Sequence, residues 1–509
     1  MAMENNYYDG SRIFSRLAEY VGVEVDQANF VISQFVALAL ASLFRTVLHP
    51  SKTKSGTRHG FGLIFGLFIG YFCFGMQAIH LAGLPALCYI VIRTTSPDIM
   101  QRLVLAVALL YLSCIHLHRQ IYDYASYTLD ISGPLMIITQ KVTSLAFCLH
   151  DGLTKNDSDL SKTQQFYAIK KIPSALEYFS YALQFPSLMA GPALYYKDYI
   201  DFIDGNNFLS AQSSSNQMAT QNGNRMVFEP SAKRAVAKKV VMAMISVVIF
   251  VKFIPSYSIQ GVKDDDFVQK SSLLYKLFYL HMATFLVRCK YYFAWLFADA
   301  ICNNSGIGFN GFDNKGNPNW NKFSNISIIG FEFSTSLRSS IESWNIGTNI
   351  WLRRVVYDRV DKKYATVLTY GLSALWHGFY PGYYVTFANG ALFTFAARNM
   401  RRTIRGYFTK TSELKLFYDI VTFATTKFVM AYITFTFVLL EFWAGLRLYV
   451  HMYMCLHILA LLALFVVPRV IPRAQVSFAS TATGTGTVTE SFTNVLKTAS
   501  RPISNNHHD

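Results

Sequence analysis

Long apolar runs separated by polar connections dominate the pattern of this chain of 509 residues. A helix needs about 20 mostly apolar residues to cross a hydrocarbon core about 30 Å thick. Some of the runs are half-spans or interfacial helices, so we expect roughly ten or eleven membrane helices. The runs are 30–48, 61–74, 79–92, 103–117, 131–149, 175–194, 240–254, 273–287, 291–301, 367–397, 417–442 and 446–467.

Polar stretches divide the chain into a polar N-terminal segment (1–28), a multi-pass membrane domain (29–470) and a C-terminal tail (471–509). The first segment lacks the basic start and short apolar run of a cleavable signal peptide, so we expect the first span to act as its own signal. Within the membrane domain, residues 205–239 are rich in Ser, Asn and Gln and are predicted to form an exposed loop. The tail is rich in Ser, Thr and Gly and is predicted to be disordered.

Composition supports a membrane protein. The chain is 52% hydrophobic and only 15% charged, too apolar for an ordinary soluble globule. The formal charge of +16 lies largely in loops such as 45–60 and 398–410. Cytoplasmic loops of membrane proteins accumulate Lys and Arg, and no basic domain outside the spans exists to hold a nucleic acid, so we predict no nucleic-acid partner. The seven cysteines are scattered and show neither a disulfide framework nor a zinc-binding spacing.

One histidine stands inside an apolar stretch. His377 lies within residues 367–397, which exceed the length of one span and are interrupted at Tyr380-Pro381-Gly382. Basic residues on both sides predict that both ends face the cytosol, so the stretch should form a hairpin or a pair of short helices dipping into the membrane. Broken backbone at membrane depth is tolerated when it is buried in protein or lines a wet cavity, and we expect His377 to face such a cavity. Ionisable groups in membrane segments mark function by default.

The preceding segment contains a second candidate. In residues 340–360, Trp344, Trp351 and Val355 fall near one helical stripe, and Asn345 lies beside it. A lone Asn is usually a helix cap or turn residue, so that structural interpretation stands next to a functional one. Residues 340–400 therefore form the predicted catalytic segment.

The two stretches WNIGTNIWLRRVVYDRV and LSALWHGFYPGYYVTF place Asn345 and His377 32 positions apart (377 − 345). This pair resembles the signature of the membrane-bound O-acyltransferase (MBOAT) family, where an Asn or His and a nearly invariant His lie in a buried reaction chamber. Further stretches resemble the lysophospholipid acyltransferase branch, closest to its ethanolamine- and serine-directed members: 127–152, 173–205, 288–312 and 391–408. The resemblance implies an all-α polytopic bundle around that chamber, and it covers much of residues 120–410.

The residue types suit acyl transfer from a thioester to a lipid hydroxyl. The hydroxyl is a poor nucleophile until it loses its proton, and an imidazole titrates in the right range to serve as general base, so His377 is the candidate base. Asn345 is the candidate hydrogen-bond donor. It would either stabilise the thioester oxygen, where such a donor is worth about 3 kcal/mol, or orient the hydroxyl.

Neighbouring residues are candidate substrate contacts. Trp344 and Trp376 each precede a candidate catalytic residue and are predicted to form the chamber wall and pack the acyl chain. Lys290, Arg353 and Arg354 are candidate ligands of the coenzyme A phosphates, although positive-inside placement explains each equally well. We predict no metal and no tightly bound cofactor, with acyl-coenzyme A as co-substrate. The resemblance implies that coenzyme A enters from the cytosolic side and the lysophospholipid from the bilayer.

Other interpretations are less well supported. HRQIYD, residues 118–123, satisfies the H-x4-D pattern of another acyltransferase class, but the Glu-Gly-Thr-Arg block that this class needs downstream is missing. A protein or sterol acceptor fits the family but not the matches outside the catalytic stretches. Transporters often show interrupted spans in both halves, and only one clear interruption exists here. We therefore predict an acyl-CoA:lysophospholipid O-acyltransferase of the endoplasmic reticulum membrane, whose head-group preference, acyl-chain preference and oligomeric state the sequence does not indicate.

Overall fold

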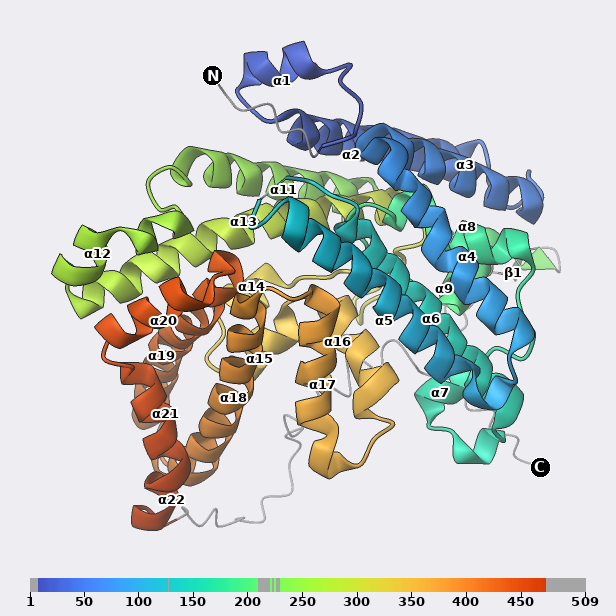
Figure 1. The fold of residues 1–509 in the computed structure, drawn as a ribbon. Helices are drawn as coiled ribbons and strands as arrows, with labels where there is room; N and C mark the ends of the chain where they lie inside the picture. Colours follow the sequence, from blue (N-terminus) through green and yellow to red (C-terminus); the bar gives the residue numbers. More distant parts are fainter. Residues whose placement is uncertain (1–7, 127, 209–219, 222–223, 226–228, 473–509) are drawn as a thin grey trace. The chain divides into compact units, whose positions relative to one another are not determined.

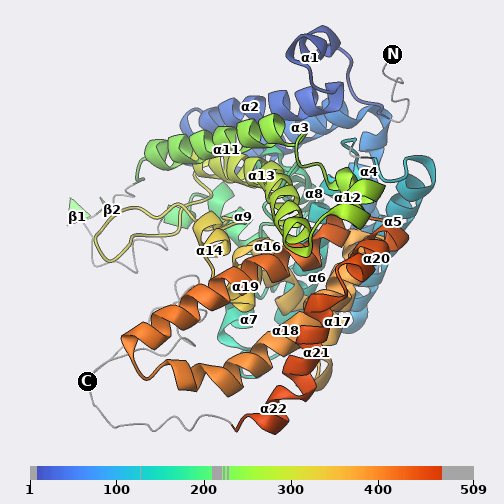
Figure 2. The ribbon, with the colours of Figure 1, turned by 90° about the vertical axis from the view of Figure 1, so that its left-hand side faces the viewer.

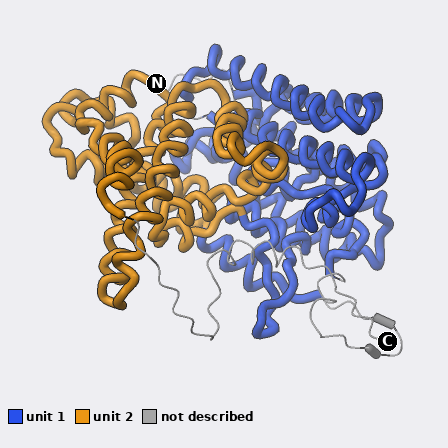
Figure 3. Tube along the Cα trace, turned by 90° about the horizontal axis from the view of Figure 1, so that it is seen from below, with its two compact units in different colours: residues 1–242, 295–324, 484–509 blue, residues 243–294, 325–483 orange. Residues whose placement is uncertain are grey.

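The computed structural model describes residues 8–126, 128–208, 220–221, 224–225 and 229–472. These residues fall into two compact units (Figure 3). Unit 1 holds the described residues up to Met242 together with Trp295–Ser324, and unit 2 holds Ala243–Ala294 together with the described residues from Asn325 onward. The predicted disordered tail lies outside the described residues, except for its first two positions, and so do residues 209–219, 222–223 and 226–228 of the predicted polar loop.

Unit 1 is helical apart from a two-residue antiparallel pair, β1 (Thr220–Gln221) and β2 (Asn224–Arg225). Its helices are α1 (Ser15–Val21), α2 (Val25–Thr46), α3 (Ser55–Phe74), α4 (Ile79–Thr94), α5 (Pro97–Tyr122), α6 (Ser132–Thr154), α7 (Lys162–Tyr167), α8 (Ala175–Leu183), α9 (Tyr196–Ile203), the start of α11 (Lys233–Phe253) and the end of α13 (Leu273–Ser305), with short 3-10 turns η1 (Gly75–Ala78), η2 (Asp157–Asp159) and η3 (Phe185–Ser187). The helices α5 and α6 run side by side (Figure 1), and their facing sides carry fully buried aliphatic residues such as Val104 and Val142.

Unit 2 contains the predicted catalytic segment. Its elements are the end of α11 (Lys233–Phe253), η4 (Ile259–Lys263), α12 (Asp265–Lys270), the start of α13 (Leu273–Ser305), α14 (Ile328–Glu332), α15 (Leu337–Ser343), α16 (Ile346–Leu352), the π-helix η5 (Arg353–Tyr357), α17 (Lys362–His377), α18 (Pro381–Phe408), α19 (Ser412–Leu439), α20 (Phe442–His451), α21 (Cys455–Phe465) and α22 (Val467–Val470). The helix α18 packs along both α19 and α21 (Figure 2), and their contact surfaces form an aromatic and aliphatic core that includes Phe393, Tyr432 and Ala460.

Four helical segments of the described chain are long and apolar enough to cross a membrane: Val25–Thr46, Ser55–Thr94, Pro97–Tyr122 and Ser412–Leu439. A fifth is possible if Phe442–His451 and Cys455–Val470, which meet at 77°, form one broken span. Large apolar side chains such as Ile64 and Phe68 stay more than 60% exposed on α3, as a lipid-facing helix requires. The expected number of ten or eleven membrane helices is not confirmed by this count.

Three predicted spans differ from the helices observed. The run 175–194 is helical only in α8, because Pro186 cannot continue a helix and the chain turns into η3. The runs 273–287 and 291–301 belong to one helix, α13, which contains neither Gly nor Pro before it ends. The segment 233–239, predicted as the end of the polar loop, already forms the first turns of α11.

Candidate functional site

His377 is the last residue of α17. The helix begins where the Asp361 side chain accepts a hydrogen bond from the backbone N–H of Lys363, and it ends because Gly378 adopts a φ of 111°, a conformation that side chains with a Cβ rarely reach. The next helix starts with Pro381 at its first position, which suits the fixed φ of proline. The interruption predicted at Tyr380-Pro381-Gly382 lies at residues 378–380 in the structure, because Pro381 and Gly382 already belong to α18. The second arm of the hairpin is not short, however, since α18 has 28 residues.

Aromatic rings surround the His377 imidazole. The centroids of Trp376, Phe437, Phe387 and Tyr383 lie 4.7, 5.0, 5.3 and 5.7 Å from the imidazole centroid. The Phe387 ring is stacked at 29°, and Phe437 meets the imidazole edge-on at 90°. These rings come from α17, α18 and α19, so tertiary packing restricts the orientation of a half-buried imidazole. That His377 faces a wet cavity stays a prediction.

Trp376 is 3% exposed, and its ring lies 5.8 Å from that of Trp351, which is 1% exposed. This contact joins α17, which ends at His377, to α16, which begins directly after Asn345. Both candidate catalytic residues thus belong to unit 2, His377 at the end of α17 and Asn345 directly before α16, and these two helices pack against each other (Figure 1). Trp376 is a buried residue packed between two helices, and both its place in a chamber wall and its contact with an acyl chain stay predictions.

Asn345 is the residue before α16 and has a left-handed backbone, with φ 46° and ψ 52°. Asn tolerates this region better than other residues with a Cβ, which agrees with the turn interpretation of the sequence. The cap interpretation is wrong for its side chain, which makes no hydrogen bond to the helix N–H groups. Instead, Asn345 Oδ1 accepts hydrogen bonds from Asn325 Nδ2 at 3.0 Å and from Thr348 Oγ1 at 2.8 Å.

Trp344, at the end of α15, packs among other rings. It lies 5.2 Å from Phe331, 5.8 Å from Tyr291 and 6.0 Å from Tyr292. The half-buried ring thus joins α13 and α14 to the turn that carries Asn345. Its role toward an acyl chain stays a prediction.

A buried ion-pair network contacts the rings that pack on Trp344. Arg288 Nε and Nη2 donate to the two Glu332 carboxylate oxygens at 2.8 and 3.1 Å, and the Tyr292 hydroxyl donates to Glu332 at 2.6 Å. Lys427 Nζ lies 3.8 Å from the same carboxylate and donates to the Phe331 carbonyl at 2.7 Å. Burial by itself raises the pKa of Glu332, but Arg288, Tyr292 and Lys427 outweigh it and hold the pKa below its ordinary value.

The predicted phosphate ligands occupy two elements. Arg353 and Arg354 are consecutive in the π-helix η5, where Arg353 Nε pairs with Asp358 at 3.2 Å. Lys290 is an exposed residue of α13. Their binding to coenzyme A stays a prediction.

The two ends of the rival H-x4-D pattern lie on and directly after α5. His118 packs its ring on Tyr122 at 4.6 Å, and the Asp123 carboxylate lies 3.9 Å from Arg119 on the preceding turn. Sequence reasoning missed Asn325, Thr348, Phe437 and Glu332, which contact the candidate site residues or their neighbours. Thr348 lies three residues after Asn345, but nothing in the sequence spacing of Asn325 or Glu332 relates them to Asn345 or His377.

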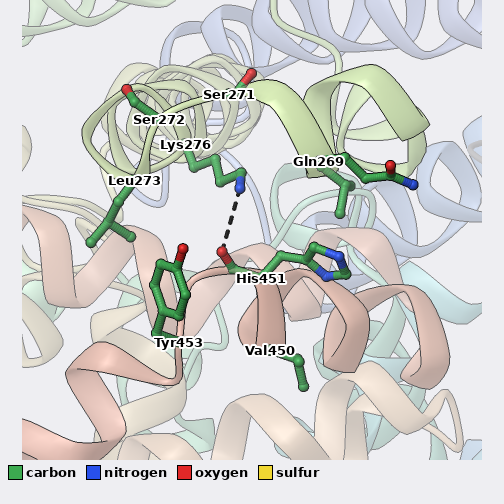
Figure 4. Close-up of a pocket in the computed structure, with 9 residues that line it drawn as sticks. Gln269, Ser271, Ser272, Leu273, Lys276, Val450, His451 and Tyr453 are labelled. Carbon is green, nitrogen blue, oxygen red and sulfur yellow. Dashed lines mark hydrogen bonds between the residues drawn. The ribbon is translucent and has the colours of Figure 1, made fainter.

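Unit 2 also contains a cavity of about 280 Å³ lined by Val268, Gln269, Ser271, Ser272, Leu273, Lys276, Val450, His451 and Tyr453 (Figure 4). Lys276 Nζ donates to the His451 carbonyl at 3.4 Å. None of the predicted site residues lines this cavity, so it adds nothing to the assignment of Asn345 and His377.

Comparison with known proteins gives the family. The chain matches the model described as MBOAT, membrane-bound O-acyltransferase family, over residues 117–440. This chain belongs to the membrane-bound O-acyltransferase family. The resemblance noted in the sequence is thereby confirmed, and the matched region contains all predicted site residues. As an MBOAT protein with apolar helices, the chain is a membrane protein.

Named relatives cover most of the chain. It is 55% identical over 469 residues to lysophospholipid acyltransferase 6 of Drosophila melanogaster, which covers 92% of this chain and 65% of the relative. It is 41% identical over 460 residues to membrane-bound glycerophospholipid O-acyltransferase 2 of Homo sapiens, covering 90% of this chain and 88% of the relative. A lysophospholipid acyltransferase of Schizosaccharomyces pombe is 30% identical over 469 residues, covering 89% and 88%. The chain thus spans slightly less than two thirds of the Drosophila relative.

Proposed function

We propose that this MBOAT protein is an acyl-CoA:lysophospholipid O-acyltransferase that re-esterifies the free hydroxyl of a lysophospholipid. Its relatives carry names of lysophospholipid and glycerophospholipid acyltransferases, and the similarity extends over about nine tenths of the chain. The proposal is further supported by two features of unit 2. The His377 imidazole, at the end of α17, is surrounded by aromatic rings, and Asn345, directly before the adjoining α16, has its amide oxygen bonded by two donors.

In the proposed reaction, His377 removes the proton from the lysophospholipid hydroxyl while the oxygen attacks the thioester carbonyl carbon. The carbonyl oxygen gains negative charge, which the Asn345 Nδ2 group stabilises by a hydrogen bond. The C–S bond then breaks, the coenzyme A thiolate leaves, and the proton held by His377 returns to that sulfur. The products are a diacyl phospholipid and free coenzyme A. No step needs a metal or a resident cofactor.

The surroundings supply the other requirements of the proposed reaction. The rings of Phe387 and Phe437 keep the imidazole in an apolar environment, where hydrogen bonds to developing charge are stronger than in water. Trp344 and Trp376 serve as the wall against the acyl chain, and Lys290, Arg353 and Arg354 as ligands of the coenzyme A phosphates. The full fold in this proposal has ten or eleven membrane helices around the reaction chamber, and the protein resides in the endoplasmic reticulum membrane.

The proposal is tested with the purified full chain in phospholipid nanodiscs. Lysophosphatidyl-choline, -ethanolamine, -serine and -inositol are offered with several labelled acyl-coenzyme A donors, and diacyl products are separated. We expect acyl-CoA-dependent product with at least one lysophospholipid, and none from a His377→Ala variant. A folded chain that acylates a sterol or a peptide in the same assay but no lysophospholipid would overturn the assignment of the acceptor.

A further inference from the structure

Neighbouring side chains hold the Asn345 amide in one orientation, and what this means for the reaction rests on the proposed function. An Asn side chain has two faces of opposite chemistry, since its oxygen accepts hydrogen bonds and its nitrogen donates them. The two atoms have nearly the same size, so the surrounding hydrogen bonds decide which one faces the reaction. In the proposed mechanism only the nitrogen is useful.

The orientation of the Asn325 side-chain amide is fixed by a backbone hydrogen bond. Its Oδ1 accepts from the backbone N–H of Gly347 at 2.8 Å, and a backbone N–H can only donate. The oxygen of Asn325 must therefore face Gly347, and its nitrogen must face Asn345, at 3.0 Å. Because that nitrogen is a donor, the Asn345 atom opposite it must be the acceptor Oδ1. Asn325 is 8% exposed, which leaves its amide little room to rotate.

The same residue also replaces the helix cap. The backbone N–H of Ile346 donates to the Asn325 carbonyl at 2.9 Å, so Asn325 takes two of the N–H groups left unpaired at the start of α16. The side chain of a residue at the position of Asn345 would ordinarily accept a hydrogen bond from one of these N–H groups. Asn325 instead performs it from 20 residues away, and the Asn345 side chain is available for another role.

Thr348 completes the arrangement. Its Oγ1 donates to Asn345 Oδ1 at 2.8 Å, and the residue is 5% exposed. Both acceptor positions of the Asn345 oxygen are then occupied. In the described part of the chain, no protein group accepts a hydrogen bond from Asn345 Nδ2. The nitrogen is thus the part of the amide that remains available to a substrate.

We propose that Asn325 and Thr348 are positioning residues that lock the Asn345 amide with its nitrogen directed to the reacting thioester or hydroxyl. Neither residue needs to touch substrate. If the donor at residue 325 is replaced by an acceptor, the Asn345 amide should rotate by 180°. This rotation exchanges Oδ1 and Nδ2 with almost no change in shape. The flipped amide presents an oxygen, which repels the developing negative charge.

The test uses Asn325→Asp and Thr348→Val in the full chain, with Thr348→Ser and Asn310→Asp as matched controls. A carboxylate at 325 still accepts from Gly347 but cannot donate to Asn345, so the amide turns over and its nitrogen donates to the carboxylate. We expect kcat to fall about 30- to 100-fold with KM for both substrates within about twofold, since the loss affects the transition state only. Thr348→Val is near-isosteric and removes one donor. It should lower kcat about three- to tenfold, while Thr348→Ser keeps the donor and wild-type kcat.

Asn310 Nδ2 donates a hydrogen bond to Asn321 Oδ1. Asn310→Asp introduces the same charge as Asn325→Asp away from the candidate site, so it serves as the control and should leave kcat unchanged. Thermal stability in detergent is measured on every variant. If Asn325→Asp does not fold, the contrast between Thr348→Val and Thr348→Ser decides. If Asn325→Asp and Thr348→Val fold and keep normal kcat, the positioning role of Asn325 and Thr348 is overturned. The proposed function would still stand in that case, provided that the wild-type chain transfers acyl groups and Asn345→Ala is inactive. Absence of transfer by the wild-type chain would instead remove the proposed function itself.

Discussion

Replacing Asn345 by alanine and by aspartate should separate its structural role from its chemical role. Alanine in a left-handed conformation costs roughly 1 to 2 kcal/mol, and Asn bears this conformation more easily. Alanine also leaves Asn325 Nδ2 and the Thr348 hydroxyl without their shared acceptor, at about 1 kcal/mol each. We therefore expect Asn345→Ala to be destabilised by about 3 to 4 kcal/mol.

Aspartate keeps what alanine loses. Its carboxylate accepts both hydrogen bonds, its short polar side chain tolerates the left-handed region, and its size is that of asparagine. The free energy of unfolding should therefore stay within about 1 kcal/mol of wild type. The one lost property is donation by Nδ2, so turnover should fall by roughly a hundredfold or more in both variants.

The measurements are the melting temperature of each purified variant in detergent and its turnover with a saturating lysophospholipid and acyl-coenzyme A. Turnover of Asn345→Asp is followed at neutral pH and above, where an exposed aspartate with its usual pKa of about 3.9 is ionised. Asn310→Ala serves as a control for the loss of an amide elsewhere. Near-wild-type turnover by Asn345→Asp at alkaline pH would refute the donor role, and a loss of turnover that only follows the loss of stability would leave Asn345 as a turn residue.

Three further variants test the surroundings. His377→Ala should fold and insert but lose transfer, whereas His118→Ala should retain it, and wild-type turnover by folded His377→Ala would remove the proposed base. Glu332→Gln leaves the guanidinium of Arg288, whose side chain is 9% exposed, without its charge partner, and should cost about 3 to 5 kcal/mol in thermal unfolding. The folded pKa of Glu332 is depressed, so its contribution to the free energy of unfolding is present above the unfolded pKa of about 4.3 and is lost as pH falls through the lower folded value. Glu332→Gln should therefore lack this part of the loss of stability in acid. Identical curves of melting temperature against pH for wild type and Glu332→Gln would contradict this expectation. Trp351→Ala opens a cavity between α16 and α17 and should cost about 3 to 5 kcal/mol in the same assay, and an unchanged melting temperature would show that the contact carries little energy.

The sequence by itself determined the class of the protein and the identity of the two candidate residues. Apolar runs long enough for a bilayer are a local property, and so is the helix break at residues 378–380, because Gly378 and Pro381 act on their own backbone. The family signature around Asn345 and His377 is local as well, and the match over residues 117–440 confirms the family it indicated. These conclusions need no knowledge of which segments meet in space.

Boundaries and partners depended on the tertiary structure. The end of α8 packs against α3, where Gly66 allows so close an approach that an added Cβ would lie 1.8 Å from the Leu183 carbonyl. The orientation of the Asn345 amide depends on Asn325, which lies 20 residues earlier and on no common helical face. A side-chain hydrogen bond between two residues so far apart in the sequence does not follow the repeat of a helix or a strand, so no sequence pattern predicts it. Thr348 is a local donor to that oxygen, but only the folded chain brings Asn325 to it, and so the fold decides which side of the amide remains for chemistry.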